Sequence, residues 1–275
     1  QVPLAYSAEG MDRQVCKHFG LPYEKPADLS KWQHIVDILK SPEGEVRIAV
    51  VGKYMMLLEA YKSLHEALIH GGIANKYKVK IKWVDSEELE KKDPAEVLND
   101  VSAVLVPGGF GLRGTQGMIN AIKYARENNL PFLGICFGMQ MSVIETMRNL
   151  CGIKNANTTE LDEHCEPVIG LMTEWDKDGA KQIRHKDGDL GGTMRLGAYD
   201  CVLAPNIKYK DMLQKAGMQV VGTSPDGGLP EIVERTDHPW FIGVQFHPEL
   251  KSRPFAPHPL FVSFVKAAID NSRLV

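Results

Sequence analysis

Apolar strands alternate with amphipathic helices through the middle of the chain, and this alternation constrains the fold more than any other feature. Three largely apolar runs have the length and composition of buried strands, namely residues 46–51, 101–106 and 132–135, and residues 79–84 alternate as a further strand. Helical patterns follow three of these strands, at residues 59–70, 117–128 and 139–147. Because strands that alternate with helices are joined by crossover connections, the pattern predicts an α/β fold. We expect a doubly wound, mostly parallel sheet flanked by helices.

The second half of the chain is less regular. Two strand-like runs, 220–224 and 231–234, flank Pro225-Asp226-Gly227-Gly228, which is typical of an antiparallel hairpin. A further apolar strand is expected at 241–246 and an amphipathic helix at 260–269. Residues 187–192 are predicted to form a loop. The helix over 59–70 is expected to end at Gly71-Gly72.

Residues 1–45 have a different character from the rest of the chain. Four prolines interrupt them, and two short helical patterns cover 11–19 and 29–39, the second with Ser30 as its expected N-cap. We therefore predict an interdomain linker at 1–45 that packs on a single domain at 46–275.

Composition excludes several classes of protein. The net charge of −3 gives no reason to expect binding to nucleic acid or to a membrane surface. The sequence has no apolar run near the roughly 20 residues that a membrane span needs, and it begins without a signal-peptide pattern. Five cysteines without CxxC spacing argue against a disulfide framework and against a zinc site, and His164-Cys165 lacks nearby ligands. We expect a cytoplasmic protein without a metal site.

Cys136 lies where the strand at 132–135 meets the helix at 139–147. Gly134 and Gly138 flank it, and glycines relieve crowding in a strained strand-to-helix turn. Such a turn presents the sulfur, and the following helix N-terminus favours its thiolate. A single cysteine in an apolar segment is more often a small buried hydrophobe, so this position needs support from elsewhere in the chain.

Two other segments give that support. His247-Pro248-Glu249 follows the strand at 241–246, and a histidine–carboxylate pair can activate a thiol. Gly108 and Gly109 follow the strand at 101–106, where backbone N–H groups can approach a developing negative charge. Since the carboxyl ends of parallel strands meet at one edge of a sheet, we expect all three segments to converge there.

These motifs resemble those of a known family, the class I (triad) glutamine amidotransferases, which have a flavodoxin-like fold. The resemblance lies in the segments 107–111, 134–140 and 247–249. Within that family the chain is similar to the glutaminase domains of CTP synthases. The more specific shared strings are Val51-Gly52-Lys53-Tyr54, Glu59-Ala60-Tyr61, Asn157-Thr158-Thr159-Glu160, Gly191-Gly192-Thr193-Met194-Arg195-Leu196-Gly197 and Leu250-Lys251-Ser252-Arg253-Pro254. The resemblance covers nearly the whole chain, with residues 1–45 similar to the linker from a synthetase domain.

The resemblance implies a role for three residues in catalysis. Cys136 would attack the carboxamide of L-glutamine, form a γ-glutamyl thioester and release ammonia. His247 would act as general base and later as acid, and Glu249 would orient it.

The resemblance also implies four substrate-binding residues. Gly109 and the amide of Phe137 would form the oxyanion hole. Gln140 and Glu160 would hold the α-amino and α-carboxylate ends of glutamine. This agrees with the chemistry of a zwitterionic ligand, whose ammonium group needs an acceptor such as a carboxylate.

Cofactors and partners follow from the same resemblance. ATP, UTP and Mg²⁺ would bind to a synthetase domain that is missing from this chain, so no cofactor is expected here. The ammonia would serve amination of UTP to CTP in that domain, and the full-length enzyme would be a homo-oligomer. Residues 55–58 and 251–254 are expected to face the missing domain, and glutamine hydrolysis by this chain alone is expected to be slow.

The chain departs from the family pattern in three places. Phe137 stands where leucine is usual, and Leu250 stands where phenylalanine is usual. An arginine-rich segment, one of whose arginines would pair with the glutamine carboxylate, is missing between Tyr209 and Lys210. Either the segment is absent from the protein, or a loop has been left out and the numbering runs across the gap; we favour the second alternative. A true loss would weaken substrate affinity.

Other functions remain open at this point. The architecture also suits a γ-glutamyl peptidase or a different amidotransferase. A non-catalytic module that works by oligomerising would keep the triad only as a scaffold. Residues 51–54 lack the spacing of a phosphate-binding loop, which disfavours a nucleotide site there.

Overall fold

A computed structural model describes residues 1–170, 174–177, 180–183, 209–225, 227 and 229–273. Within this part of the chain the main sheet has seven strands in the order β2-β1-β3-β4-β11-β10-β9. Five neighbouring strands are parallel, namely β2 (Tyr77–Asp85), β1 (Gly44–Gly52), β3 (Ala103–Val106), β4 (Phe132–Ile135) and β11 (Phe241–Val244). Each predicted strand is present, so the predicted α/β fold with a mostly parallel sheet is confirmed.

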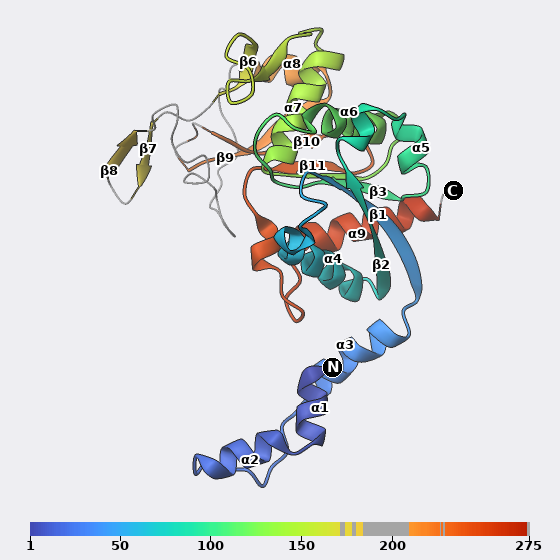
Figure 1. Ribbon diagram of the computed structural model, residues 1–275, viewed down its shortest axis with the longest axis vertical. Coiled ribbons are helices and arrows are strands. Elements are labelled where there is room, and N and C mark those ends of the chain that lie inside the picture. The colour runs from blue at the N-terminus through green and yellow to red at the C-terminus, as the bar shows by residue number, and fades with distance from the viewer. Residues whose placement is uncertain (171–173, 178–179, 184–208, 226, 228, 274–275) are drawn as a thin grey trace.

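Helices cover both faces of the sheet, as a doubly wound fold requires (Figure 1). One face packs against α4 (Lys62–Ala74) and α9 (Pro259–Ser272), and the other against α6 (Thr115–Glu127) and α7 (Phe137–Asn149). Alternate residues of β3 enter the two cores, because successive side chains of a strand point to opposite faces. Leu105 packs with the α9 side, and Val104 and Val106 pack with the α7 side.

The predicted hairpin closes the sheet at its antiparallel end. β9 (Met218–Thr223) pairs antiparallel with β10 (Pro230–Arg235), which pairs antiparallel with β11. This confirms the hairpin, although Asp226 and Gly228 of its turn lie outside the described residues. The predicted loop at 187–192 lies outside them as well.

Shorter elements complete the described chain. They are η1 (Leu58–Tyr61), η2 (Glu88–Glu90), α5 (Pro94–Leu98), β5 (Ala156–Thr158), β6 (Glu166–Ile169), β7 (Glu174–Lys177), β8 (Ala180–Ile183), α8 (Lys210–Lys215) and η4 (Pro248–Lys251). β5 pairs with β6 and β7 pairs with β8, each as a small separate sheet. None of the described helices is both long and apolar enough to cross a membrane.

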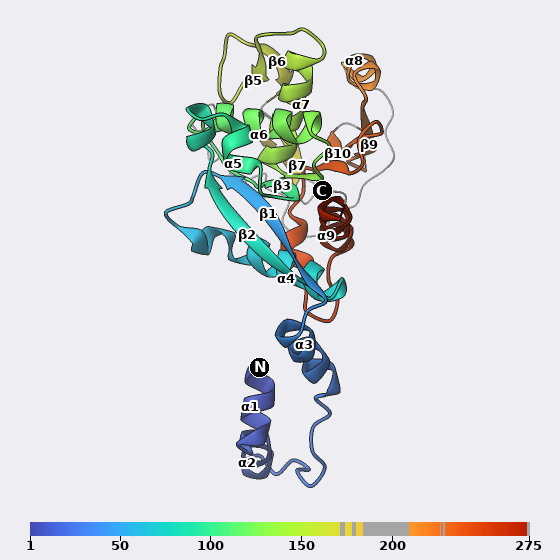
Figure 2. The same cartoon turned by 90° about the vertical axis from the view of Figure 1, so that its right-hand side faces the viewer.

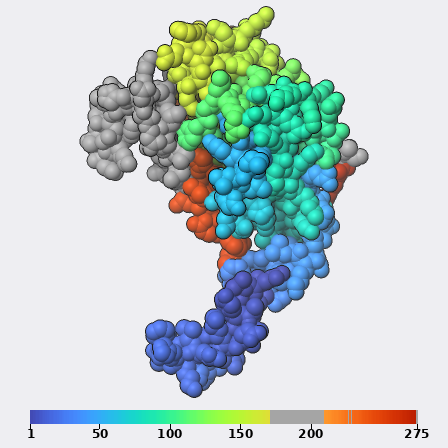
Figure 3. Space-filling model, viewed as in Figure 1, coloured from blue at the N-terminus to red at the C-terminus, as the bar shows by residue number. Residues whose placement is uncertain are grey.

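The N-terminal segment extends away from the α/β body (Figures 1, 2 and 3). Its helices are α1 (Val2–Ala8), α2 (Met11–His18) and α3 (Ser30–Lys40). None of the residues of α1 and α2, all of which are described, is buried. Ile35 and Val36 of α3 are buried where α3 meets α4. In the structure, therefore, α3 makes the contact between this segment and the α/β body. The predicted boundary between linker and domain at residue 45 stays a prediction.

Two helix ends differ from the sequence prediction. Ser30 is not the N-cap of α3; the cap position is Leu29, and the Asp28 carboxylate accepts the Ser30 N–H at 3.0 Å. The predicted end of α4 at Gly71-Gly72 is also wrong, since the helix continues to Ala74. A Cβ at Gly71 would lie 2.6 Å from the backbone oxygen of Phe261, so this glycine lets α4 approach α9 closely.

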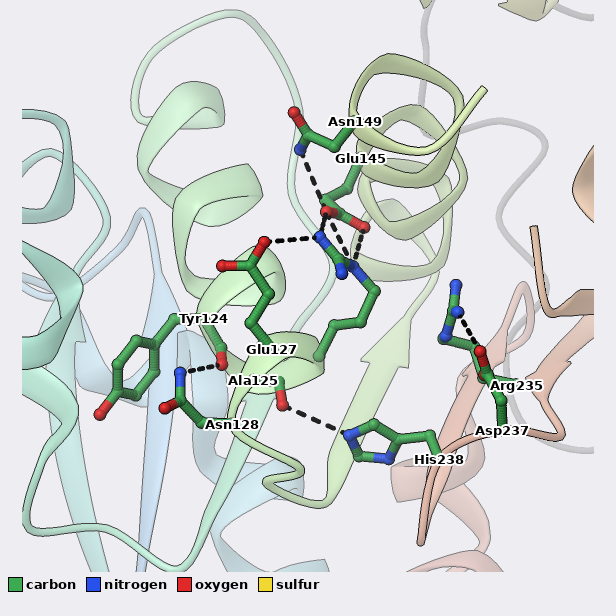
Figure 4. Close-up of polar contacts among 10 residues, drawn as sticks. Tyr124, Ala125, Glu127, Asn128, Glu145, Asn149, Arg235, Asp237 and His238 are labelled. Carbon is green, nitrogen blue, oxygen red and sulfur yellow. Dashed lines mark hydrogen bonds and ion pairs between the residues drawn. The ribbon is translucent and has the colours of Figure 1, made fainter. Parts of the chain in front are cut away.

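A buried ion pair fixes α7 against α6 (Figure 4). Glu145 of α7 is fully buried, and its carboxylate accepts hydrogen bonds from Arg126 of α6 at 2.7 Å and from Asn149 at 3.0 Å. Below it in the view, His238 contacts the backbone oxygen of Ala125 at 3.3 Å. The ion pair holds α7, the helix that begins directly after Cys136, against α6.

Candidate active site

Cys136 forms a strained turn between β4 and α7. Its backbone has φ 53° and ψ −103°, an unusual conformation for a residue other than glycine. Its N–H donates to the backbone oxygen of Val244 at 2.7 Å, which ties the turn to β11. A Cβ at Gly138 would lie 2.0 Å from the backbone oxygen of Val106. A Cβ at Gly134 would lie 2.8 Å from the backbone oxygen of Gly138. The expected crowding around the turn is therefore present.

His247 and Cys136 meet above Gly108. A Cβ at Gly108 would lie 2.9 Å from Cε1 of His247 and 3.6 Å from both its Nε2 and the Cβ of Cys136. Glycine is therefore needed here because a side chain would fill the space in which the two residues meet. On the other side of the imidazole ring, Nδ1 of His247 contacts Oε1 of Glu249 at 2.7 Å. Nε2 of His247 is buried and has no hydrogen-bond partner among the described residues.

The charge state of His247 follows from these neighbours. Burial favours the neutral imidazole, but Cys136 and the Glu249 carboxylate outweigh it and raise the pKa of His247 to about 10. An imidazolium beside the sulfur favours the thiolate, which is the reactive form of cysteine. The arrangement therefore places a charged imidazole beside the sulfur.

A cavity of about 260 Å³ lies in front of these residues. Four of the seven predicted site residues line it: Cys136, His247, Glu249 and Gly109. The rest of its wall consists of Tyr54, Ala60, Tyr61, Ser63, Leu64, Pro107, Gly108, Phe110 and Leu250. Cys136 is only 8% exposed and lines this cavity. The three predicted segments thus converge at the carboxyl ends of β3, β4 and β11.

Phe137, Gln140 and Glu160 are not among the described residues that line this cavity. Phe137 is the first residue of α7, so its amide belongs to the positive end of the helix. Nε2 of Gln140 donates to Oε1 of Gln245 at 3.2 Å. Oε1 of Glu160 accepts the N–H of Gly111 at 3.2 Å, beside the glycine-rich loop after β3.

Lys53 is a site residue whose role the sequence analysis missed. It is 3% exposed, and its Nζ donates to the backbone oxygens of Phe110 (3.1 Å) and Gly111. The same ammonium lies 4.3 Å from the centre of the Phe137 ring. Burial lowers the pKa of Lys53 to about 8, against the opposing influence of Glu160. Lys53 thus joins the glycine-rich loop to the start of α7; the available signal was a lysine directly after a buried strand.

Gln245 is the second residue that sequence reasoning missed. Its Nε2 lies 3.5 Å from Sγ of Cys136. The signal was a polar residue in the apolar run 241–246, two positions before His247. Among the described residues, the structure contains no group of three or more His, Cys, Asp or Glu side chains that could hold a metal ion.

Known proteins share both the sequence and the fold. The family model for glutamine amidotransferase class-I matches residues 56–267. CTP synthase of Zymomonas mobilis is 56% identical over 299 residues, and that of Rhodospirillum rubrum is 53% identical over 298. Each match covers 100% of this chain but 55% of the relative, so the chain spans about half the length of these curated proteins. The matched stretches also exceed the 275 residues of the chain, so the relatives contain segments without a counterpart here.

A solved structure agrees with these matches. The glutaminase domain of Trypanosoma brucei CTPS, with bound acivicin, is 33% identical and superimposes with a TM-score of 0.71. The superposition covers 82% of this chain and 94% of that domain. The chain therefore belongs to the class I glutamine amidotransferase family and, within it, to the glutaminase domains of CTP synthases.

Proposed function

We propose that this domain hydrolyses L-glutamine to glutamate and ammonia through a Cys136–His247–Glu249 triad. The observation that carries the proposal is the strained turn at Cys136, which faces the same cavity as a His247–Glu249 pair joined at 2.7 Å. A sulfur at a helix N-terminus beside an imidazolium is poised for attack on a carbonyl carbon.

In the first half-reaction, the thiolate of Cys136 adds to the side-chain carboxamide carbon of glutamine. His247, which is protonated at neutral pH because its pKa is raised to about 10, gives a proton to the leaving nitrogen. In this proposal it acts first as acid and then as base, the reverse of the order that the resemblance implied. The C–N bond breaks, ammonia leaves, and a γ-glutamyl thioester remains on the sulfur. Glu249 keeps the imidazole ring oriented and stabilises its charge through Nδ1.

In the second half-reaction, neutral His247 takes a proton from water. The resulting hydroxide adds to the thioester carbon, and the C–S bond breaks to return the thiolate of Cys136. The glutamate carboxyl group then ionises to solvent, and His247 is again an imidazolium beside the sulfur. No atom beyond glutamine and one water is consumed.

Both half-reactions place negative charge on the carbonyl oxygen. We assign its stabilisation to the N–H groups of Gly109 and Phe137, supported by the position of Phe137 at the start of α7. Lys53 contacts both segments, the loop through the backbone oxygens of Phe110 and Gly111 and the start of α7 through the Phe137 ring. For the α-amino and α-carboxylate ends of glutamine we assign Gln140 and Glu160, whose carboxylate suits an ammonium group.

For the whole protein we propose the role of a CTP synthase. Ammonia from this domain would feed an ATP- and Mg²⁺-dependent amination of UTP in a synthetase domain, which is supported by the match to about half of each relative. Residues 1–45 would form the linker and 46–275 the glutaminase domain. Residues 55–58 and 251–254 would face the synthetase domain; Met56, with 98% of its surface exposed, supports this for the first segment. We also propose a homo-oligomer and a cytoplasmic location, the latter supported by five cysteines without CxxC spacing.

The test is steady-state hydrolysis of glutamine, followed by ammonia release at neutral pH. Wild-type protein should release ammonia, and Cys136→Ala should abolish the release. Cys16→Ala is the matched control because Cys16 lies on α2, outside the cavity. Equal rates for wild type and Cys136→Ala would contradict the proposal.

A further inference from the structure

Gln245 connects the sulfur of Cys136 to Gln140. It directly follows β11, and its backbone N–H donates to the backbone oxygen of Glu231 at 2.8 Å, which fixes its place beside β10. Its side chain turns toward the α7 turn, with Nε2 at 3.5 Å from Sγ of Cys136. Its Oε1 accepts a hydrogen bond from Nε2 of Gln140 at 3.2 Å. The three side chains form one chain of hydrogen bonds that ends on the sulfur.

The direction of this chain is set at Gln140, whose Nε2 donates to Gln245. A carboxamide has one accepting end and one donating end. Gln140 uses its donating end on Gln245, so Gln245 must present its oxygen there and its NH₂ group to the sulfur. A hydrogen bond donated to an ionisable group favours the charged form of that group. An N–H aimed at the sulfur therefore favours the thiolate and holds it in place.

We propose that Gln245 is a positioning residue that holds the Cys136 sulfur as a thiolate, and that Gln140 fixes the orientation in which it can do so. The inference rests on the proposed function, since it assumes that Cys136 is the nucleophile. It adds a second role for Gln140, which acts on the sulfur through Gln245 in addition to any contact with glutamine. It also explains a polar side chain at the end of an otherwise apolar strand.

Other charged residues of the site and beside Gln245 must stay constant in a test. By element they are Lys53 after β1, Glu160 after β5, Glu231 on β10, and His247 and Glu249 after β11. None of them is changed when Gln245 or Gln140 is substituted. A change in the behaviour of the sulfur can then be assigned to the carboxamide itself.

The test measures the rate at which iodoacetamide alkylates Cys136 as a function of pH, read on the Cys136 peptide by mass spectrometry. Gln245→Met keeps the length of the side chain and removes its N–H donor. We expect about tenfold slower alkylation on the acidic side of the profile, with the same plateau at high pH. Gln245→Glu should slow it further, because a carboxylate would face the thiolate. Gln219→Met, on β9 at the edge of the sheet, is the control and should leave the profile unchanged.

The role of Gln140 is tested by a double-mutant cycle. Gln140→Met should shift the alkylation profile in the same direction as Gln245→Met, and its effect should vanish in the Gln245→Met background. Thermal melting of each variant shows whether it is folded. An unchanged profile in both folded Gln245 variants would overturn the proposal. A rate lowered equally at every pH would overturn it too, because it would mean altered access to the sulfur.

Alkylation needs no glutamine, which separates this inference from the proposed function. A wild-type protein that releases ammonia from glutamine, together with an unchanged Gln245→Met profile, refutes the inference alone. A shifted profile in a protein that never hydrolyses glutamine refutes the proposed function and supports the hydrogen bond to the sulfur.

Discussion

Substitution of Gly138 by alanine tests whether close packing at the start of α7 sets the geometry of the site. Two effects oppose each other. Alanine in a helix interior is favoured over glycine by about 1 kcal/mol. Against this, the new Cβ would lie 2.0 Å from the backbone oxygen of Val106, whereas carbon and oxygen normally stay at least about 3.3 Å apart. The turn or β3 must move by roughly 1 Å, and overpacking of this kind costs about 1–3 kcal/mol.

The clash should prevail, since the obstacle is backbone and not the end of a flexible side chain. We expect Gly138→Ala to be less stable by up to about 2 kcal/mol after the helix gain is subtracted, which lowers the melting temperature by up to roughly 8 °C for a domain of this size. Because Val106 leads directly into Pro107-Gly108-Gly109, the same movement displaces the loop that faces Cys136. A misplacement of about 1 Å can reduce activity by about 100-fold.

The assay is urea and thermal unfolding beside ammonia release from glutamine. Gly170→Ala is the matched control, since no described atom lies within 4 Å of a Cβ at Gly170 and its φ is not positive. It should be close to neutral in both assays. A Gly138→Ala protein that is as stable and as active as wild type would refute the reasoning, because the helix gain would then have outweighed the contact with Val106.

Three further predictions follow from particular contacts. Lys53→Met should reduce ammonia release more than tenfold, because the loop at Phe110 loses the hydrogen bond that holds it. Urea unfolding should show unchanged or higher stability, since the substitution removes a desolvated ammonium group. Because the pKa of His247 is raised, its protonation stabilises the folded state fully below about pH 6.5, and this contribution is lost as the pH rises through about 10. The difference in unfolding free energy between wild type and His247→Gln should therefore shrink by a few kcal/mol between about pH 6 and about pH 9.5. A difference that stays constant over this range would contradict the prediction. Arg126→Met should lower the free energy of unfolding in urea by about 3–5 kcal/mol, because Glu145 is left buried and unpaired. Lys266→Met, which breaks an exposed ion pair, should lower it by less than about 1 kcal/mol. Similar losses for the two variants would contradict this prediction.

Much of the fold could be predicted because strand and helix patterns are local properties. The run at 132–135 is apolar throughout and that at 46–51 is apolar except for the exposed Arg47, and both lie in strands whose apolar residues are buried in the sheet. The turn at Cys136 could be anticipated for a similar reason, since Gly134 and Gly138 show that two backbones approach each other there.

The features that were missed depend on contacts between distant segments. Gly71-Gly72 is a sound stop signal by itself, but the two glycines lie inside α4 because Phe261 and Tyr77 approach the helix there. Gln245 contacts the sulfur of Cys136, which is 109 residues earlier in the chain, only because β11 lies beside the turn before α7. Lys53 likewise can bind the backbone oxygen of Phe110 only once the loop after β3 lies over it.

The most direct test of the account is to trap the covalent intermediate on its sulfur. Wild-type protein is mixed with saturating glutamine, quenched in acid during steady turnover, digested and examined by mass spectrometry. We expect a γ-glutamyl adduct on the peptide that contains Cys136 and on no other cysteine-containing peptide. Steady ammonia release without any adduct on Cys136, or with the adduct on Cys16, Cys151 or Cys165, would contradict it.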